Sequence, residues 1–144
     1  MTTSHLPRHS VSVAAVVVDE QGRLLAVRRA DNDHWEPPGG VLELNESVED
    51  GLRREVLEET GLAVEPERLT GVYKNMARGI VALVFRCRLT GGELTATSEA
   101  RECRWLSPAE VRELLTEAYA VRMLDALDPG PAAVRSHDGT RLSP

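Results

Sequence analysis

The chain has 144 residues, with 23 acidic and 17 basic side chains and a formal net charge of −6. This length suits one ordinary domain with a real core, and the acidic balance argues against a surface built mainly for nucleic acid or an anionic membrane. A phosphate-bearing substrate is not excluded, because a bound cation reverses the local charge.

The cysteines and the N-terminal segment bear on the compartment. Cys87 and Cys103 lie in apolar, strand-like runs, which indicates free thiols rather than a disulfide or a zinc site. The apolar run 13–18 is too short to span a bilayer, and no signal-peptide pattern precedes it. We therefore expect a cytoplasmic protein.

The first half of the chain predicts two strands and a helix. Residues 11–18 and 23–29 flank a turn at 19–22, which predicts a hairpin. A loop rich in proline and glycine follows. Residues 45–60 then predict a helix, because Val48, Leu52 and Val56 recur every four residues and Gly61 is a natural left-handed stop.

The second half predicts strands followed by helices. Strands are expected over 71–75, 80–89 and 103–106, with a turn at 90–92. Ser107 and Glu110 have the capping-box spacing, which predicts a helix to about residue 115, and a second helix is expected over 117–127. Residues 128–144 form a tail that is either a small hairpin near Asp138 and Gly139 or loosely ordered.

The predicted helix 45–60 carries the candidate chemistry. Glu55, Glu58 and Glu59 stand at i, i+3 and i+4, so they share one face and repel one another. A solvated acidic face is one interpretation. The other is a site for a hard divalent cation such as Mg²⁺, which takes oxygen ligands and suits a substrate that brings phosphate oxygens.

The wider spacing favours the second interpretation. From residue 40 to 62 the chain resembles the Nudix box, the signature of the Nudix hydrolase superfamily, including its MutT-like members, at Gly40, Glu46, Arg54, Glu55, Val56, Glu58, Glu59, Gly61 and Leu62. The resemblance implies an α+β Nudix fold, a three-layer α/β/α sandwich with a mixed central sheet. We expect this domain to cover residues 1–127.

The resemblance also implies a reaction and roles for residues. Such enzymes hydrolyse a phosphoanhydride of a nucleoside diphosphate linked to another group, with Mg²⁺ or Mn²⁺ as cofactor. The Gly40 carbonyl and the three helix glutamates are expected to bind metal, with Glu58 the first candidate for general base and Glu55 the second. Arg54 is expected to orient glutamates by pairing with Glu46 and Glu58.

One further acid is expected to complete the metal site. Glu99 and Glu102 both precede Trp105, and Glu99 is the preferred candidate, although either side chain is also explained as simply solvated. Gly39, like Gly40, lacks a Cβ and lets backbone groups approach an ion or a phosphate closely.

Residues that recognise the substrate are less defined by the sequence. Arg29 is a candidate for a phosphate or a base edge, or an ordinary surface arginine. Trp35 and Tyr73 are candidates for stacking on a base, among only five aromatic residues. His137 has no partner that the sequence predicts.

Three functional hypotheses result. The first is a metal-dependent pyrophosphohydrolase of a small-molecule nucleotide, with no nucleic-acid or membrane partner, acting as a monomer or a homodimer. Its expected substrate is a nucleoside triphosphate, cleaved to the monophosphate and pyrophosphate, with ADP-ribose or another nucleoside diphosphate sugar as the alternative. The others are a catalytically silent, nucleotide-sensing Nudix module and an unrelated acidic cation-binding protein.

Overall fold

The computed structural model, which describes residues 5–95 and 97–144, contains two sheets. The larger has the strand order β4-β1-β6-β5-β8, in which β1 runs parallel to β6 and β5 parallel to β8 while the other pairs are antiparallel. Its strands are β1 (Ser10–Val17), β4 (Gly39–Val41), β5 (Leu62–Asn75), β6 (Ile80–Gly92) and β8 (Ala133–His137). The smaller, antiparallel sheet has the order β3-β2-β7, with β2 (Leu24–Arg29), β3 (Trp35–Glu36) and β7 (Ala100–Leu106).

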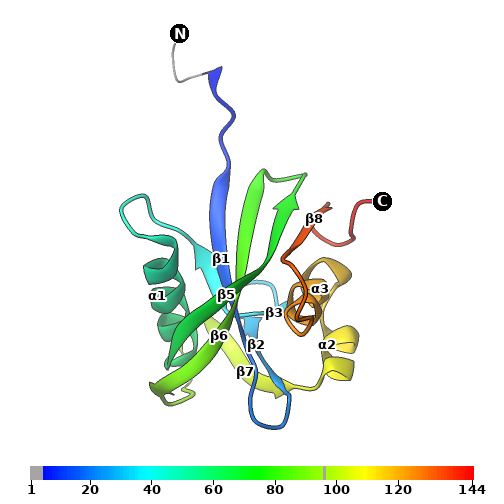
Figure 1. Ribbon diagram of the computed structural model, residues 1–144. Coiled ribbons are helices and arrows are strands. Elements are labelled where there is room, and N and C mark those ends of the chain that lie inside the picture. The colour runs from blue at the N-terminus through cyan, green and yellow to red at the C-terminus, as the bar shows by residue number, and fades with distance from the viewer. Residues whose placement is uncertain (1–4, 96) are drawn as a thin grey trace.

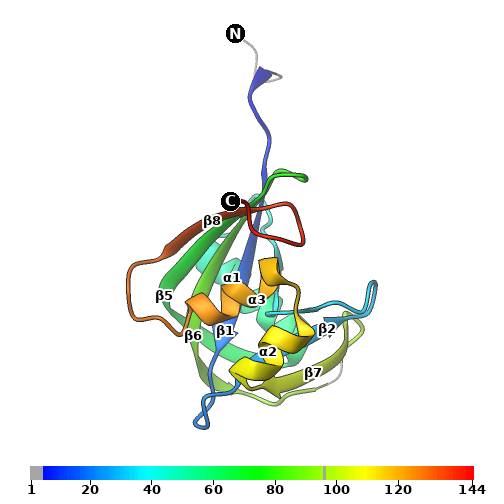
Figure 2. The same cartoon turned by 90° about the vertical axis from the view of Figure 1, so that its right-hand side faces the viewer.

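Three helices cover the strands from opposite sides (Figures 1 and 2). They are α1 (Val48–Thr60), α2 (Pro108–Leu114) and α3 (Glu117–Asp125), with α1 on one side and the other two across the sheet from it. Strand β1 explains this layering, because successive side chains point to opposite faces. Ala14 and Val16 belong to the core cluster beneath α2 and α3, whereas Val13, Ala15 and Val17 belong to the cluster beneath α1. The expected α+β sandwich with a mixed sheet is thus confirmed.

The expected hairpin of residues 11–18 and 23–29 is wrong. Only an isolated bridge joins Val18 to Leu24, and β1 and β2 otherwise pair within different sheets. The physical reason is burial on both faces: residues 13–17 and 24–27 are all buried. Strands buried on both faces are central strands with a partner on each side, rather than the two arms of an exposed hairpin.

Helix α1 begins three residues later than the predicted start at 45. Ser47 is its N-cap, and the Ser47 hydroxyl accepts a hydrogen bond from the Asp50 amide at 3.1 Å. The helix ends as expected at Gly61, which adopts the left-handed conformation with φ of 79°. The predicted capping box of Ser107 and Glu110 at the start of α2 is confirmed.

One further segment differs from the sequence prediction, and the tail forms a strand in addition to the turn expected near Asp138 and Gly139. Residues 90–92, expected as a turn, are the end of β6, where Gly91 and Gly92 pair with Ala63 and Leu62 at the start of β5. The tail adds strand β8 to the edge of the larger sheet and then turns at Asp138 and Gly139, with an isolated bridge between His137 and Leu142. Among the described residues, no helix is long and apolar enough to cross a membrane.

Candidate metal and substrate site

Two glycines bring strand β4 unusually close to its neighbours. A Cβ at Gly39 would overlap the backbone of Val13 and Ala14 on β1, and a Cβ at Gly40 would overlap the carboxylate of Glu55 on α1. Gly39 therefore needs glycine for close approach of two backbones and not for a special φ, whereas a Cβ at Gly40 would displace the end of the Glu55 side chain. Together they hold the backbone of β4 against the acidic side chains of α1.

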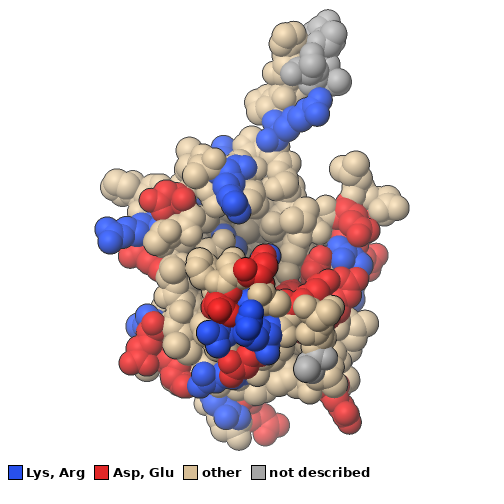
Figure 3. Space-filling view, turned by 180° about the vertical axis from the view of Figure 1, so that it is seen from behind, with Lys and Arg blue, Asp and Glu red and all other residues tan. Residues whose placement is uncertain are grey.

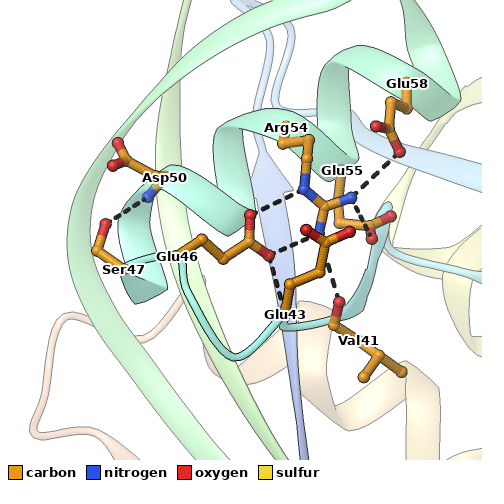
Figure 4. Close-up of polar contacts among 8 residues, drawn as sticks. All are labelled: Val41, Glu43, Glu46, Ser47, Asp50, Arg54, Glu55 and Glu58. Carbon is orange, nitrogen blue, oxygen red and sulfur yellow. Dashed lines mark hydrogen bonds and ion pairs between the residues drawn. The ribbon is translucent and has the colours of Figure 1, made fainter.

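Arg54 connects three carboxylates around this junction (Figure 4). Its Nε and Nη2 donate to the two oxygens of Glu46, at 2.9 and 2.6 Å. Its Nη1 donates to Glu55 at 3.0 Å and to Glu58 at 3.3 Å. The expected contacts with Glu46 and Glu58 are present, and the contact with Glu55 adds a third.

Glu46 ties the loop before α1 to the same arginine. Its Oε1 also accepts a hydrogen bond from the Glu43 amide at 2.9 Å. The Arg54 hydrogen bonds, with that of the Glu43 amide, lower the pKa of Glu46 to about 2. Glu46 and Leu42 also lie where a Cβ at Gly51 would stand, which explains a glycine inside a helix.

Three carboxylates converge beside Gly40. One oxygen from each of Glu55, Glu58 and Glu99 lies within 4.8 Å of the others. Glu99 comes from the segment just before β7, far from α1 in sequence. Glu102 lies outside this group and instead faces Arg28 at 3.8 Å and Arg104 at 3.9 Å. The cluster thus gathers the hard oxygen donors that a divalent cation such as Mg²⁺ requires.

Glu59 is buried next to this cluster and is only 6% exposed. One of its oxygens, Oε1, accepts a hydrogen bond from the Gly39 amide at 2.7 Å. Burial raises the pKa of Glu59 to about 8, and burial also raises the pKa of Glu55. Both shifts describe a site in which acidic groups crowd together and a cation would favour their charged forms.

Two cavities meet at Gly39, Gly40 and Val41. The first, the acidic cavity, has a volume of about 370 Å³ and is lined by Glu55, Glu59 and Glu99 among others. The second, the α3 cavity, has a volume of about 280 Å³ and extends to side chains of β1, β6 and α3. Figure 3 shows the face of the molecule opposite to Figure 1, which is hollowed near its centre and flanked by acidic and basic side chains.

The structure separates the residues expected to recognise substrate. Arg29 lines both cavities and is held by ion pairs with Asp31 at 2.7 Å and Glu36 at 3.2 Å. Trp35 lines neither cavity and packs against the core, with Arg104 over its ring. Tyr73 is fully buried and donates to Asp125 at 2.7 Å, so its ring has no face free for a base.

Most residues that line the α3 cavity were not predicted from the sequence, and three of them bear on its chemistry. They are Glu36, Tyr119 and Arg122. Arg122 was detectable in principle, because it interrupts an otherwise apolar stretch of helix between Val121 and Met123. No periodic spacing in the sequence relates Glu36 to Tyr119, because the two residues reach the cavity from separate elements.

Comparison with known proteins places the chain in a family. The model of the NUDIX domain matches residues 8–127. A "MutT-like protein" of Streptomyces ambofaciens is 62% identical over 138 residues, covering 96% of this chain and 90% of that protein. The chain therefore belongs to the Nudix family.

Two more distant relatives carry names of activities. The "ADP-ribose pyrophosphatase" of Methanocaldococcus jannaschii is 32% identical over 96 residues, which cover 62% of this chain and 57% of that protein. The crystal structure of an ADP-ribose pyrophosphatase from Streptococcus suis superposes with a TM-score of 0.73 at 27% identity, covering 88% of this chain and 98% of that one. The chain is accordingly a Nudix hydrolase, from a family of pyrophosphohydrolases that act on small nucleotides and generally use divalent metals.

Proposed function

We propose that this enzyme hydrolyses a nucleoside triphosphate to the monophosphate and pyrophosphate, using Mg²⁺ held at the acidic cavity. The observation that carries the proposal is the convergence of Glu55, Glu58 and Glu99 within 4.8 Å, next to a cavity of suitable size for a nucleoside. The shared lining at Gly39 and Gly40 would place the phosphate chain between the metal and the nucleoside.

The proposed metal ligands are oxygens of this junction. They are the Gly40 carbonyl, Glu55, Glu58 and Glu99. Glu59 is a further candidate, because its Oε1 accepts from Gly39 while Oε2 remains for a cation. Glu102 is left out of the proposed site because it lies outside the cluster of Glu55, Glu58 and Glu99. The bound cation would supply charge neutralisation at the phosphates and a more acidic water.

The chain's own residues supply positioning and proton transfer. Glu58 is the proposed general base, since its side chain is 46% exposed whereas that of Glu55 is 13% exposed. Arg54 orients both carboxylates through the hydrogen bonds of its Nη1, and the bidentate pair with Glu46 fixes the guanidinium. Arg29, which lines both cavities, is positioned to contact the phosphates.

A second candidate substrate is ADP-ribose, which the names of two relatives favour. This compound also presents a diphosphate that would span Gly39 and Gly40. The reaction is placed in the cytoplasm, because a reducing compartment suits the free thiols of Cys87 and Cys103.

A substrate panel tests the proposal. Nucleoside triphosphates, ADP-ribose and nucleoside diphosphate sugars are incubated with Mg²⁺, and orthophosphate, pyrophosphate and nucleotide products are measured separately. Pyrophosphate and a nucleoside monophosphate from a triphosphate are the expected products. Intact triphosphates, together with AMP and ribose phosphate from ADP-ribose, would reject the first candidate in favour of the second.

A further inference from the structure

Arg122 is a buried cation that has no counter-ion in contact. It is 7% exposed, lines the α3 cavity, and its Nε is buried without a hydrogen-bond partner. Within residues 5–95 and 97–144, no carboxylate lies within 4.0 Å of its guanidinium. Burial of a donor without a hydrogen bond is unfavourable, and because Nε is itself inaccessible, the donors left for a ligand in the α3 cavity are those of the terminal nitrogens Nη1 and Nη2.

Among the described residues, the single polar contact of this guanidinium is to a ring that a second donor also contacts. Nη2 of Arg122 lies 3.1 Å from Nε2 of His137, while the backbone N–H of Gly139 donates to Nδ1 of the same ring at 2.9 Å. A neutral imidazole has one acceptor nitrogen, and both neighbours are obligatory donors. The ring can therefore satisfy only one of them at a time. A protonated imidazole would offer no acceptor at all. The neutral form is favoured, because burial and then the charge of Arg122 lower the pKa of His137.

Aromatic rings hold the guanidinium in place from its faces. Its carbon lies 4.5 Å from the ring centroid of Tyr119 and 5.4 Å from that of Tyr73. Such contacts hold a planar cation while its in-plane N–H groups stay available. The same cavity is lined by apolar atoms of Ala14, Ala82 and Ile80, which suit a flat ring better than a free phosphate.

The other charged residues of the cavity do not replace Arg122. Arg29 is already paired with Asp31 and Glu36. Glu36 is mostly buried, and its hydrogen-bonding partner is Arg29 rather than Arg122. Arg78 lies on the loop between β5 and β6, at the margin of the same cavity. Of the three arginines, Arg122 is the one on a rigid helix with a buried, unsatisfied donor.

We propose that Arg122 is a specificity-determining residue that binds the base edge of the substrate through two neighbouring hydrogen-bond acceptors, and that His137 positions it. This inference rests on the proposed function, since it places the nucleoside in the α3 cavity. His137 lies in β8, beyond the residues that the family model matches. The tail thereby contributes to substrate selection.

The chemistry of the bases defines the ligand class. A guanidinium presents paired donors, and two adjacent acceptors occur at O6 and N7 of guanine or hypoxanthine and at N3 and O2 of cytosine. Adenine places its amino group beside N1 and N7 and has no second acceptor next to N3, and uracil separates its two carbonyl oxygens by an N–H. Adenine and uracil would therefore leave a donor of Arg122 unpaired.

Binding of product-like nucleotides tests this without any turnover. Isothermal titration with Mg²⁺ present compares GMP, IMP, CMP, AMP and UMP on the wild-type enzyme. We expect one of two results: GMP and IMP together, or CMP by itself, should bind at least about tenfold more tightly than AMP and UMP. Equal affinity for all five overturns the proposal. Tight binding of GMP alone also overturns it, because IMP keeps O6 and N7 and lacks only the 2-amino group.

Three variants separate recognition from folding. Arg122→Lys keeps the charge but loses the paired N–H donors of the guanidinium. It should bring the ratio of affinities, that of the preferred nucleotides over that of AMP and UMP, close to one. His137→Gln retains an acceptor for Arg122 and should keep the ratio, whereas His137→Leu should reduce it. Melting temperatures are measured alongside, because a purely structural role of His137 would lower stability in His137→Leu and leave the ratio unchanged, which contradicts the positioning role.

Failure of the role of Arg122 can be told apart from failure of the proposed function. If the substrate panel shows no cleavage of triphosphates while the preference among monophosphates is present, the nucleoside site stands and only the leaving group was misassigned. If triphosphates are cleaved while all monophosphates bind equally, the reaction stands and the role of Arg122 is rejected.

Discussion

Helices α1 and α2 begin in the same way but use their glutamates differently. Each starts at a serine N-cap whose hydroxyl accepts a backbone hydrogen bond at 3.1 Å. In α2, Glu110 finds its partner three residues away, accepting from the Ser107 amide at 2.9 Å. In α1, Glu55 and Glu58 face Glu99 from a distant segment, and Arg54 is shared among several acids.

The difference separates a stability motif from a functional one. Glu110 satisfies backbone groups of its own helix, which stabilises the helix end. Glu55 and Glu58 are placed where like charges accumulate, and α1 has no basic residue in its last turn to offset them. An arrangement that is unfavourable for the empty helix becomes favourable once a cation binds.

The largest effect is expected from Glu58→Gln. This change keeps the shape and helix propensity but removes the charge needed for a metal ligand or a base. kcat should fall by at least about a hundredfold, or about 2.7 kcal/mol in barrier, with the fold retained. Steady-state kinetics at saturating Mg²⁺ provide the measurement. The matched control is Glu113→Gln on the exposed side of α2, and similar rates for both variants would remove Glu58 from the site.

Metal binding should reveal which acid from outside α1 belongs to the cluster. Mg²⁺ at about a hundred times its dissociation constant should stabilise the wild-type enzyme by about 2.7 kcal/mol, raising its melting temperature. Glu99→Gln should show a smaller rise, whereas Glu102→Gln should match the wild type. A smaller rise in Glu102→Gln than in Glu99→Gln would reverse the assignment.

The acidic part of the site was accessible from the sequence because its spacing is local. Glu55, Glu58 and Glu59 stand at i, i+3 and i+4 of a helix whose period is fixed, so their shared face follows from the chain alone. Glu99 was preferred over Glu102 without a geometric reason. In the structure Glu102 stands opposite Arg28 within the β2–β7 ladder, whereas Glu99 lies just before β7, and this register is not readable from the sequence.

The α3 cavity was not accessible because its residues come from separate elements. Arg122 is on α3, Glu36 on β3 and Arg29 on β2, and no periodicity relates them. Tyr73 failed as a stacking candidate for a related reason. Its strand is covered by α3, which buries the ring, and strand patterns do not show which helix will cover them. The prediction of a hairpin from residues 11–18 and 23–29 is wrong for another reason. The turn at 19–22 shows where the chain reverses direction but not which strands pair with each other.

The N-caps of the two helices should contribute equally. Ser107→Ala and Ser47→Ala each remove a side-chain acceptor for the first turn, which costs about 1 kcal/mol. Urea unfolding in the absence of Mg²⁺ measures both. Ser107→Ala should leave kcat unchanged, because α2 contributes nothing to the acidic cavity. If Ser107→Ala lowers the free energy of unfolding much more than Ser47→Ala does, the two helices differ in their caps as well as in their acids.

The smallest effect concerns the charge of Glu110. Hydrogen bonds from Ser107, first the backbone amide and then the hydroxyl, lower the pKa of Glu110 below its ordinary value of 4.5. The folded-state pKa is depressed, so this stabilisation is present above pH 4.5 and is lost as pH falls through the folded-state pKa. Glu110→Gln retains a side-chain acceptor but carries no charge, and its melting temperature should lie slightly below the wild type at pH 7. The gap should close on acidification towards pH 3, and a gap that is constant from pH 7 to pH 3 would show that the charge contributes nothing beyond the hydrogen bond.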